Sequence, residues 1–243
     1  MIELWIPITI LAAFSQNLRS ALQKHLKSRL STAGATYVRF FYAVPFAFLY
    51  LFILNQFFYL PLPEPNANFI IFGIIGGGTQ IIATALLVYL FSFRNFAVGT
   101  AYSKTETAQT AVFGLIILGD PLTPGAIIGI MISLVGVMAI STARQENGLK
   151  NIIQSLSQKT ALIGLASGAM FGMSAISYRA ASLSLGGEGV VIQAAYTLAC
   201  VTIFQTLVMT IYLQLKEKGE VINVIKNWRI AILVGLSGMI GSA

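Results

Sequence analysis

The sequence predicts an all-α fold, a polytopic bundle of transmembrane helices, from its composition and from the length of its apolar runs. Hydrophobic residues make up 56% of the 243 residues and charged residues 9%, and the mean hydropathy is +0.81. A water-soluble domain of this size would need a far more charged surface. The apolar residues fall into runs of about twenty, the length that a helix needs to cross a bilayer. We therefore expect most side chains to face lipid or other helices.

Seven complete spans and one partial span are predicted, separated by turns rich in Pro and Gly. Their expected bounds are Leu4–Leu22, Ala35–Phe57, Phe69–Phe93, Phe96–Leu118, Pro124–Thr142, Ala161–Ala180 and Gly189–Leu215, and then the partial Trp228–Ala243. As a helix the last stretch would rise about 24 Å, against a hydrocarbon core of about 30 Å. We therefore expect a chain that is truncated at its carboxyl end.

The distribution of lysine and arginine over the connections between spans predicts that the amino terminus lies outside the cytoplasm. With that orientation the outer connections hold only Arg179. The cytoplasmic connections hold Lys24, Lys27, Arg29, Arg94, Arg144, Lys150, Lys159, Lys216, Lys218, Lys226 and Arg229. Arg19, Arg39 and Lys104 fall within spans.

The order of the spans predicts two five-helix repeats of opposite orientation. The expected division is a first repeat at 1–143, a cytoplasmic linker at 144–159 and a second repeat at 160–243 that is truncated in its third helix. The loop after the first span is basic and the one after the sixth is nearly uncharged, as inverted repeats require. Within the linker, Gln145–Gln158 is expected to be an interfacial helix or a plain connection.

The fourth and fifth spans carry residues that resemble a known family. These are Asn95–Gln109, Phe113–Leu122 and Gly129–Gly136. Their layout resembles the helix, acidic turn and glycine-rich helix of the drug/metabolite transporter superfamily in its EamA branch. The resemblance implies ten helices in two inverted halves around a central cavity, and movement of small organic solutes by alternating access. The turn acid here is Asp120 where the family usually has Glu, and better-known members place their termini in the cytoplasm.

Lys104 and Glu106 are charged residues near the start of the otherwise apolar fourth span. A charge at that depth costs about 2.5–3.5 kcal/mol, so both side chains should face the bundle interior. They lie about 200° apart around a helix and cannot easily pair with each other. Glu106 shares its helix face with Tyr102, Gln109 and Thr110, a polar stripe that could hydrogen-bond a solute or relay a proton.

Two interpretations stay open for each of these charges. Glu106 either lines a cavity or forms a fixed ion pair with Arg39 of the second span. Lys104 either lines the cavity or extends to the membrane interface near Arg94. A titrating Glu106 would allow proton-coupled export, whereas an exchanger or facilitator needs no such residue.

The first span adds further polar residues. Arg19 is expected to extend to the interface, which leaves Asn17 and Gln16 as cavity candidates. The predicted substrate-binding or coupling residues are Glu106, Tyr102, Gln109, Lys104, Arg39 and Asn17.

Glycines predict where helices pack closely. Two stripes of small residues, Gly164-Gly168-Gly172 on the sixth span and Gly125-Gly129-Ser133 on the fifth, permit close helix contact. Gly76-Gly77-Gly78 should loosen the third span as a hinge or as a place where backbone approaches a solute, and Pro45 should kink the second span.

Enzyme activity is not expected. The single histidine, His25, lies in a basic loop without a carboxylate cluster, so no catalytic residue, metal site or cofactor is predicted. The expected partners are a small-molecule solute and the lipid bilayer, not nucleic acid, and a homodimer is left open. The expected location is the cell membrane, plasma or inner, with several passes. A non-transporting membrane scaffold or receptor is the alternative function.

Overall fold

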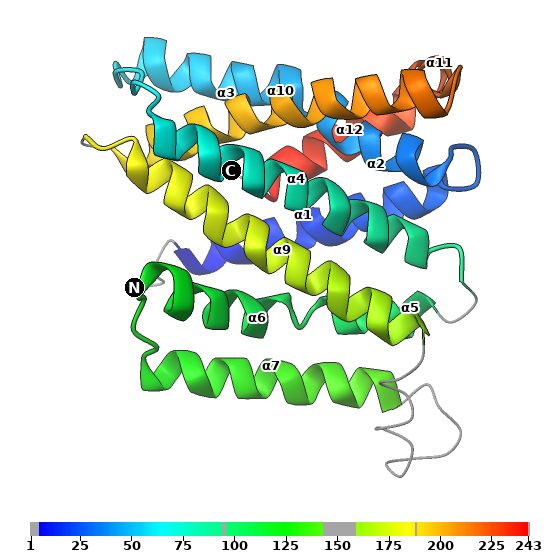
Figure 1. The fold of residues 1–243 in the computed structure, drawn as a ribbon, viewed down its shortest axis with the longest axis horizontal. Helices are drawn as coiled ribbons and strands as arrows, with labels where there is room; N and C mark the ends of the chain where they lie inside the picture. The colour runs from blue at the N-terminus through cyan, green and yellow to red at the C-terminus, as the bar shows by residue number, and fades with distance from the viewer. Residues whose placement is uncertain (1–4, 94–95, 143–158, 188, 243) are drawn as a thin grey trace. The chain divides into compact units, whose positions relative to one another are not determined.

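The computed structural model describes residues 5–93, 96–142, 159–187 and 189–242, and every regular element in these ranges is a helix (Figure 1). The all-α fold class is thereby confirmed. The elements are α1 (Trp5–Leu26), α2 (Thr32–Phe41), α3 (Val44–Phe57), α4 (Ala67–Leu90), α5 (Phe96–Ser103), α6 (Glu106–Phe113), the π-helix η1 (Gly114–Leu118), α7 (Pro124–Thr142), α9 (Lys159–Ser184), α10 (Val190–Lys216), α11 (Glu220–Lys226) and α12 (Trp228–Ile240). The predicted linker segment Gln145–Gln158 lies outside the described residues.

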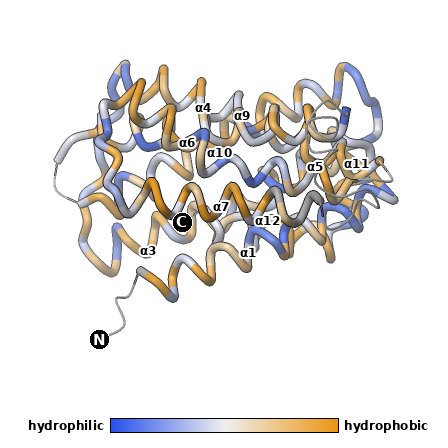
Figure 2. The backbone as a smooth tube through the Cα atoms, turned by 90° about the horizontal axis from the view of Figure 1, so that it is seen from below, coloured by the Kyte–Doolittle hydropathy of each residue, from blue (hydrophilic) through white to orange (hydrophobic). Residues whose placement is uncertain are grey.

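Four segments in the described ranges are long and apolar enough to cross a membrane. These are Thr32–Phe57, which joins α2 and α3, and the helices α4, α9 and α10. A fifth candidate is the pair of α11 and α12, which are bent by 89° relative to each other. Figure 2 shows hydrophobic residues along most of the helices. α1, predicted as the first span, is not among the candidates, because polar residues run through its second half.

The fourth predicted span is not one helix, which corrects the expectation of a continuous Phe96–Leu118. Lys104 and Thr105 form a turn between α5 and α6, and their N–H groups bond to the carbonyls three residues earlier. The hydroxyls of Ser103 and Thr105 donate to the carbonyls of Thr100 and Tyr102. Such local hydroxyl bonds compete with the regular helical pattern, and they account for a break that apolar periodicity alone does not predict.

The second predicted span is divided near the predicted kink. α2 ends at Phe41 and α3 begins at Val44, with Pro45 in the first turn of α3. Proline fits there because the first turn of a helix leaves its N–H groups without partners inside the helix.

The chain forms two compact units. The first unit comprises residues 1–77 and 181–243, and the second comprises residues 78–180, so α4 and α9 contribute to both. This partition concerns packing alone, and the predicted repeats at 1–143 and 160–243 stay predictions.

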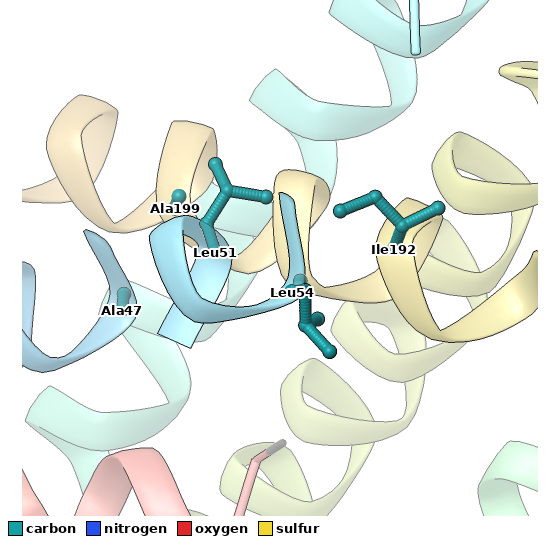
Figure 3. Packing of buried hydrophobic residues seen from close by; sticks show 6 residues of the cluster. Ala47, Leu51, Leu54, Ile192 and Ala199 are labelled. Atoms are coloured by element: carbon teal, nitrogen blue, oxygen red, sulfur yellow. The ribbon is translucent and has the colours of Figure 1, made fainter. Parts of the chain in front are cut away.

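In the first unit α10 is the central packing partner. It contacts α3 through a cluster that includes Ala47, Leu51 and Leu54 of α3, with Ile192 and Ala199 of α10 (Figure 3). The first half of α4 packs on α10 at Gly77, where an added Cβ would lie 2.7 Å from a ring carbon of Phe204. α4 is continuous through the three consecutive glycines Gly76, Gly77 and Gly78, and at Gly77 the missing side chain makes room for an aromatic ring.

In the second unit α9 packs on the broken pair α5 and α6, which lie end to end, and α7 runs beside this pair (Figure 1). The glycine stripe of α9 makes the predicted close contact. A Cβ at Gly164 would overlap the backbone carbonyl of Gly99, and one at Gly172 would lie 3.0 Å from the Thr110 hydroxyl oxygen. The prediction for the α7 stripe is wrong for the part of the chain that the structure describes, because a Cβ at Gly125 or Gly129 would meet none of its atoms within 4 Å.

Candidate functional site

The polar residues predicted on the fourth span gather around the break between α5 and α6. Tyr102 is buried near the end of α5, in a cluster with Val98 and Ala161. Glu106 is the first residue of α6 and is half-buried. A carboxylate in the first turn of a helix is stabilised by the helix dipole, so the break gives Glu106 a favourable place inside an apolar segment.

Gln109 connects this polar stretch to α9. Its side-chain amide donates to the Thr105 hydroxyl at 2.8 Å and to the backbone carbonyl of Leu165 at 3.4 Å. Gly168 of α9 lies under the break, where an added Cβ would be 2.9 Å from the Ser103 carbonyl oxygen. Tyr102, Glu106 and Gln109 therefore lie on one short segment, and α9 packs against the backbone of this segment at Gly168.

Lys104 lies in the turn itself and is exposed. Lys104 lies in the turn and Glu106 starts the next helix, so the predicted difference in the directions of the two side chains stays a prediction. Lys104 and Glu106 both make interactions in the folded chain. The proposed choice between a cavity contact and an ion pair of Glu106 with Arg39 stays a prediction, since the two residues belong to different units.

Arg179 and Asp120 form an ion pair at the far end of α9. Asp120 follows Gly119, which has a left-handed backbone with φ of +70° and ends η1. The preceding residue, Tyr178, donates its hydroxyl to the side-chain oxygen of Gln80 at 3.0 Å. The sequence indicated Arg179 and Asp120 for separate reasons, and the fold brings these two residues together.

The first unit has a second polar site, formed by two buried arginines. Arg19 of α1 is 4% exposed and Arg39 of α2 is 6% exposed. Both pack against Gly238 of α12, where an added Cβ would lie 3.4 Å from Cδ of Arg19 and 3.6 Å from Cγ of Arg39. The expectation that Arg19 extends to the membrane interface is wrong, because α12 runs along α1 and covers this side chain.

The other polar residues of α1 divide between structural and exposed positions. Gln16 donates to the carbonyl of Gly241 at 3.1 Å, and the fully buried Gln23 donates to the carbonyl of Ala35 at 3.0 Å. Asn17, predicted as a cavity residue, is exposed. The spacing of Gln16, Arg19 and Gln23 by three and four residues places them on one helix face, a signal that could have identified this polar face from the sequence.

Two hydrogen bonds of α10 were not predicted. The Tyr37 hydroxyl lies 2.8 Å from that of Thr210, and the Gln205 amide donates to the Gly77 carbonyl at 3.2 Å. The second bond is made to Gly77 of α4, the same glycine that packs against the ring of Phe204. In the described ranges no group of three or more His, Cys, Asp or Glu side chains could hold a metal ion.

The EamA-like transporter family model matches residues 3–142. None of the curated proteins matches the sequence. The matched range includes both buried arginines and the polar segment around Glu106.

Proposed function

Because the chain belongs to the EamA-like transporter family, we propose that it carries small organic solutes across a membrane by alternating access. The family consists of membrane transporters, and four to five apolar segments of the described chain are able to span a bilayer. The solute class, the direction and the coupling described below are parts of the proposal.

The observation that carries the proposal is the burial of Arg19 and Arg39 around Gly238. Charges inside apolar helices are expensive and mark solute or ion pathways. Arg19 and Arg39 belong to the same unit and are both buried. We take these two guanidinium groups as the feature that favours a solute with a carboxylate or phosphate group. Guanidinium groups suit such groups because they form paired, charge-assisted hydrogen bonds.

We assign Glu106 the coupling role. Its place at a helix break, beside Tyr102 and Gln109, gives it neighbours that can hydrogen-bond either a proton-bearing carboxyl group or a solute. A proton-driven exporter needs such a residue, whereas an exchanger does not. The predicted ion pair of Glu106 with Arg39 is the competing structural role.

The cell membrane is the proposed location, with the amino terminus outside and a homodimer as the assembly to be tested. The proposed division into inverted repeats is supported by the end of the family match at residue 142, one residue before the predicted end of the first repeat. A non-transporting scaffold remains the second function, distinguished by the absence of flux.

The test is solute efflux from proteoliposomes. Vesicles containing the purified protein are loaded with carboxylates, phosphate esters, amines and neutral sugars, and the released solutes are measured by mass spectrometry. We expect release of anionic solutes above that from protein-free vesicles, and a loss of about tenfold or more in Arg39→Gln, the scale of one charge-assisted hydrogen bond. Release of amines alone would contradict the anionic class, and no release of any solute would favour the scaffold.

A further inference from the structure

The segment around α11 combines exposed apolar and basic side chains. Ile222, Ile225 and Trp228 are 58%, 50% and 53% exposed. The exposed basic residues around them are Lys216, Lys218, Lys226 and Arg229. We call these seven residues the α11 surface. The chain thus has, at one end of the first unit, a surface that neither water alone nor hydrocarbon alone solvates well.

α11 lies directly before α12 in the chain and is almost perpendicular to it. α12 packs along α1 in the opposite direction, since Gly238 lies at Arg19 and Gly241 lies at Gln16 and Ala12. The start of α12 therefore lies toward the end of α1 and its basic loop. The bend of 89° between α11 and α12 directs α11 along the membrane plane if α12 runs into the bilayer. A short amphipathic helix in that position lies in the headgroup region.

The two acidic residues near this surface are turned inward. Glu217 accepts a hydrogen bond from the Ser31 hydroxyl at 2.5 Å, and Glu220 accepts one from the Ser31 backbone N–H at 2.6 Å. The other carboxylate oxygen of Glu220 accepts from the Asn223 amide at 3.0 Å. Both carboxylates thus lie at the N-terminus of α2, where the helix dipole favours negative charge. Because these carboxylates bond to Ser31 and Asn223, the charged side chains of the α11 surface are all basic.

The loop between α1 and α2 brings further positive charge to the same place. Arg29 donates to the side-chain oxygen of Asn227, between α11 and α12, at 3.5 Å. Lys24 in the last turn of α1 and Lys27 in the loop precede it. Arg229 stands over the ring of Trp228, with its guanidinium carbon 5.7 Å from the ring centroid. Tryptophan is enriched where chains cross from headgroups to hydrocarbon, so this contact puts a cation at the depth of the lipid phosphates.

We propose that the α11 surface binds the headgroup of an anionic phospholipid. The apolar side chains Ile222, Ile225 and Trp228 contact the upper part of the acyl chains, and Lys218, Lys226 and Arg229 contact the phosphate and the negative headgroup. A free phosphate ion would satisfy the cations but would leave the three apolar side chains in water, so the lipid is the occupant that fits both. This inference rests on membrane insertion and not on the transported solute.

The test uses Trp228 as the reporter. The sequence contains two tryptophans, Trp5 and Trp228, so a Trp5→Phe background leaves Trp228 as the single tryptophan. The protein is reconstituted in phosphatidylcholine vesicles in which a fraction of the lipid is dibrominated near the headgroup, either as phosphatidylglycerol or as phosphatidylcholine. Bromine quenches tryptophan on contact, so the ratio of the two quenching curves gives the preference for the anionic lipid.

We expect a preference for brominated phosphatidylglycerol of about fivefold or more, the factor that one basic residue near an anionic surface supplies. The Lys218→Gln/Lys226→Gln double variant should reduce the preference to below half of its original value. The matched control, Lys150→Gln/Lys159→Gln, removes the same charge from another predicted cytoplasmic connection and should keep the preference. Arg229 is left unchanged because its contact with Trp228 would alter the fluorescence directly.

Three results would overturn the proposal. Equal quenching by the two lipids would show that no anionic site lies near Trp228. Equal losses in the two double variants would show a general effect of charge. A preference that inorganic phosphate abolishes, while chloride at the same ionic strength does not, would assign the site to free phosphate.

Discussion

Arg179 and Asp120 form an ion pair that joins the end of α9 to the turn between η1 and α7. The side chains are 52% and 32% exposed, so water and salt screen their attraction. The pair nevertheless has a definite geometric setting. Asp120 follows the left-handed Gly119, and its N–H bonds to the Gly114 carbonyl. The turn thus holds the carboxylate next to the end of α9.

The first prediction concerns this ion pair. Asp120→Asn and Arg179→Gln should each lower the free energy of unfolding by no more than about 1 kcal/mol, because exposed pairs contribute little. Asp120→Glu should retain the pair. The measurement is thermal unfolding of the detergent-solubilised protein at low and at high salt. The double variant should lose no more than either single one, and fully additive losses would show that the two side chains do not interact.

The second prediction compares the two glycine stripes. Gly164→Ala should destabilise the protein by about 1–3 kcal/mol, the range for overpacking, because the new Cβ would overlap the Gly99 carbonyl. Gly129→Ala, the matched control on α7, adds a methyl group where no atom lies within 4 Å. It should be neutral or stabilise by up to about 1 kcal/mol through helix propensity. Size-exclusion chromatography after heating measures both, and equal losses in the two variants would contradict the packing described for α9.

These stripes also show what the sequence can and cannot predict. The pattern Gly164-Gly168-Gly172 correctly predicted a close contact, and the same spacing on α7 wrongly predicted another. A stripe of small residues shows only that another helix could approach closely. Whether a helix does so depends on the tertiary fold. The membrane class could be predicted more reliably, because the length of an apolar run is a property of the sequence alone.

The polar sites were predicted less completely. Tyr102, Glu106 and Gln109 were singled out because polar residues stand out in an apolar run, and their role in binding or coupling stays a prediction. The break at Lys104 was missed, because it depends on hydroxyl bonds from Ser103 and Thr105 that propensity does not reveal. The burial of Arg19 was missed for a different reason: it depends on α12, which is distant in the sequence and approaches through Gly238.

The third prediction concerns the N-terminus of α2. Ser31→Ala removes the hydroxyl that accepts from the Gly34 N–H and donates to Glu217. We expect a loss of about 1 kcal/mol in the free energy of unfolding, the usual cost of deleting a helix cap. Ser28→Ala is the control, because the Ser28 hydroxyl bonds only to the nearby His25 carbonyl and is exposed. Thermal unfolding that ranks Ser28→Ala as the more damaging variant would contradict the capping role.

The fourth prediction separates coupling from solute binding at Glu106. Gln has nearly the same shape as Glu but no titrating group, so Glu106→Gln should abolish flux driven by a proton gradient while solute exchange at equal pH continues. Arg39→Gln should reduce both kinds of flux, because the proposed role of Arg39 is to bind the solute itself. Both are measured in the same proteoliposomes, with and without an imposed pH difference. If Glu106→Gln leaves gradient-driven flux unchanged, Glu106 has no proton role. If it unfolds the protein, and Arg39→Gln does so to the same extent, the fixed ion pair becomes the better account of both residues.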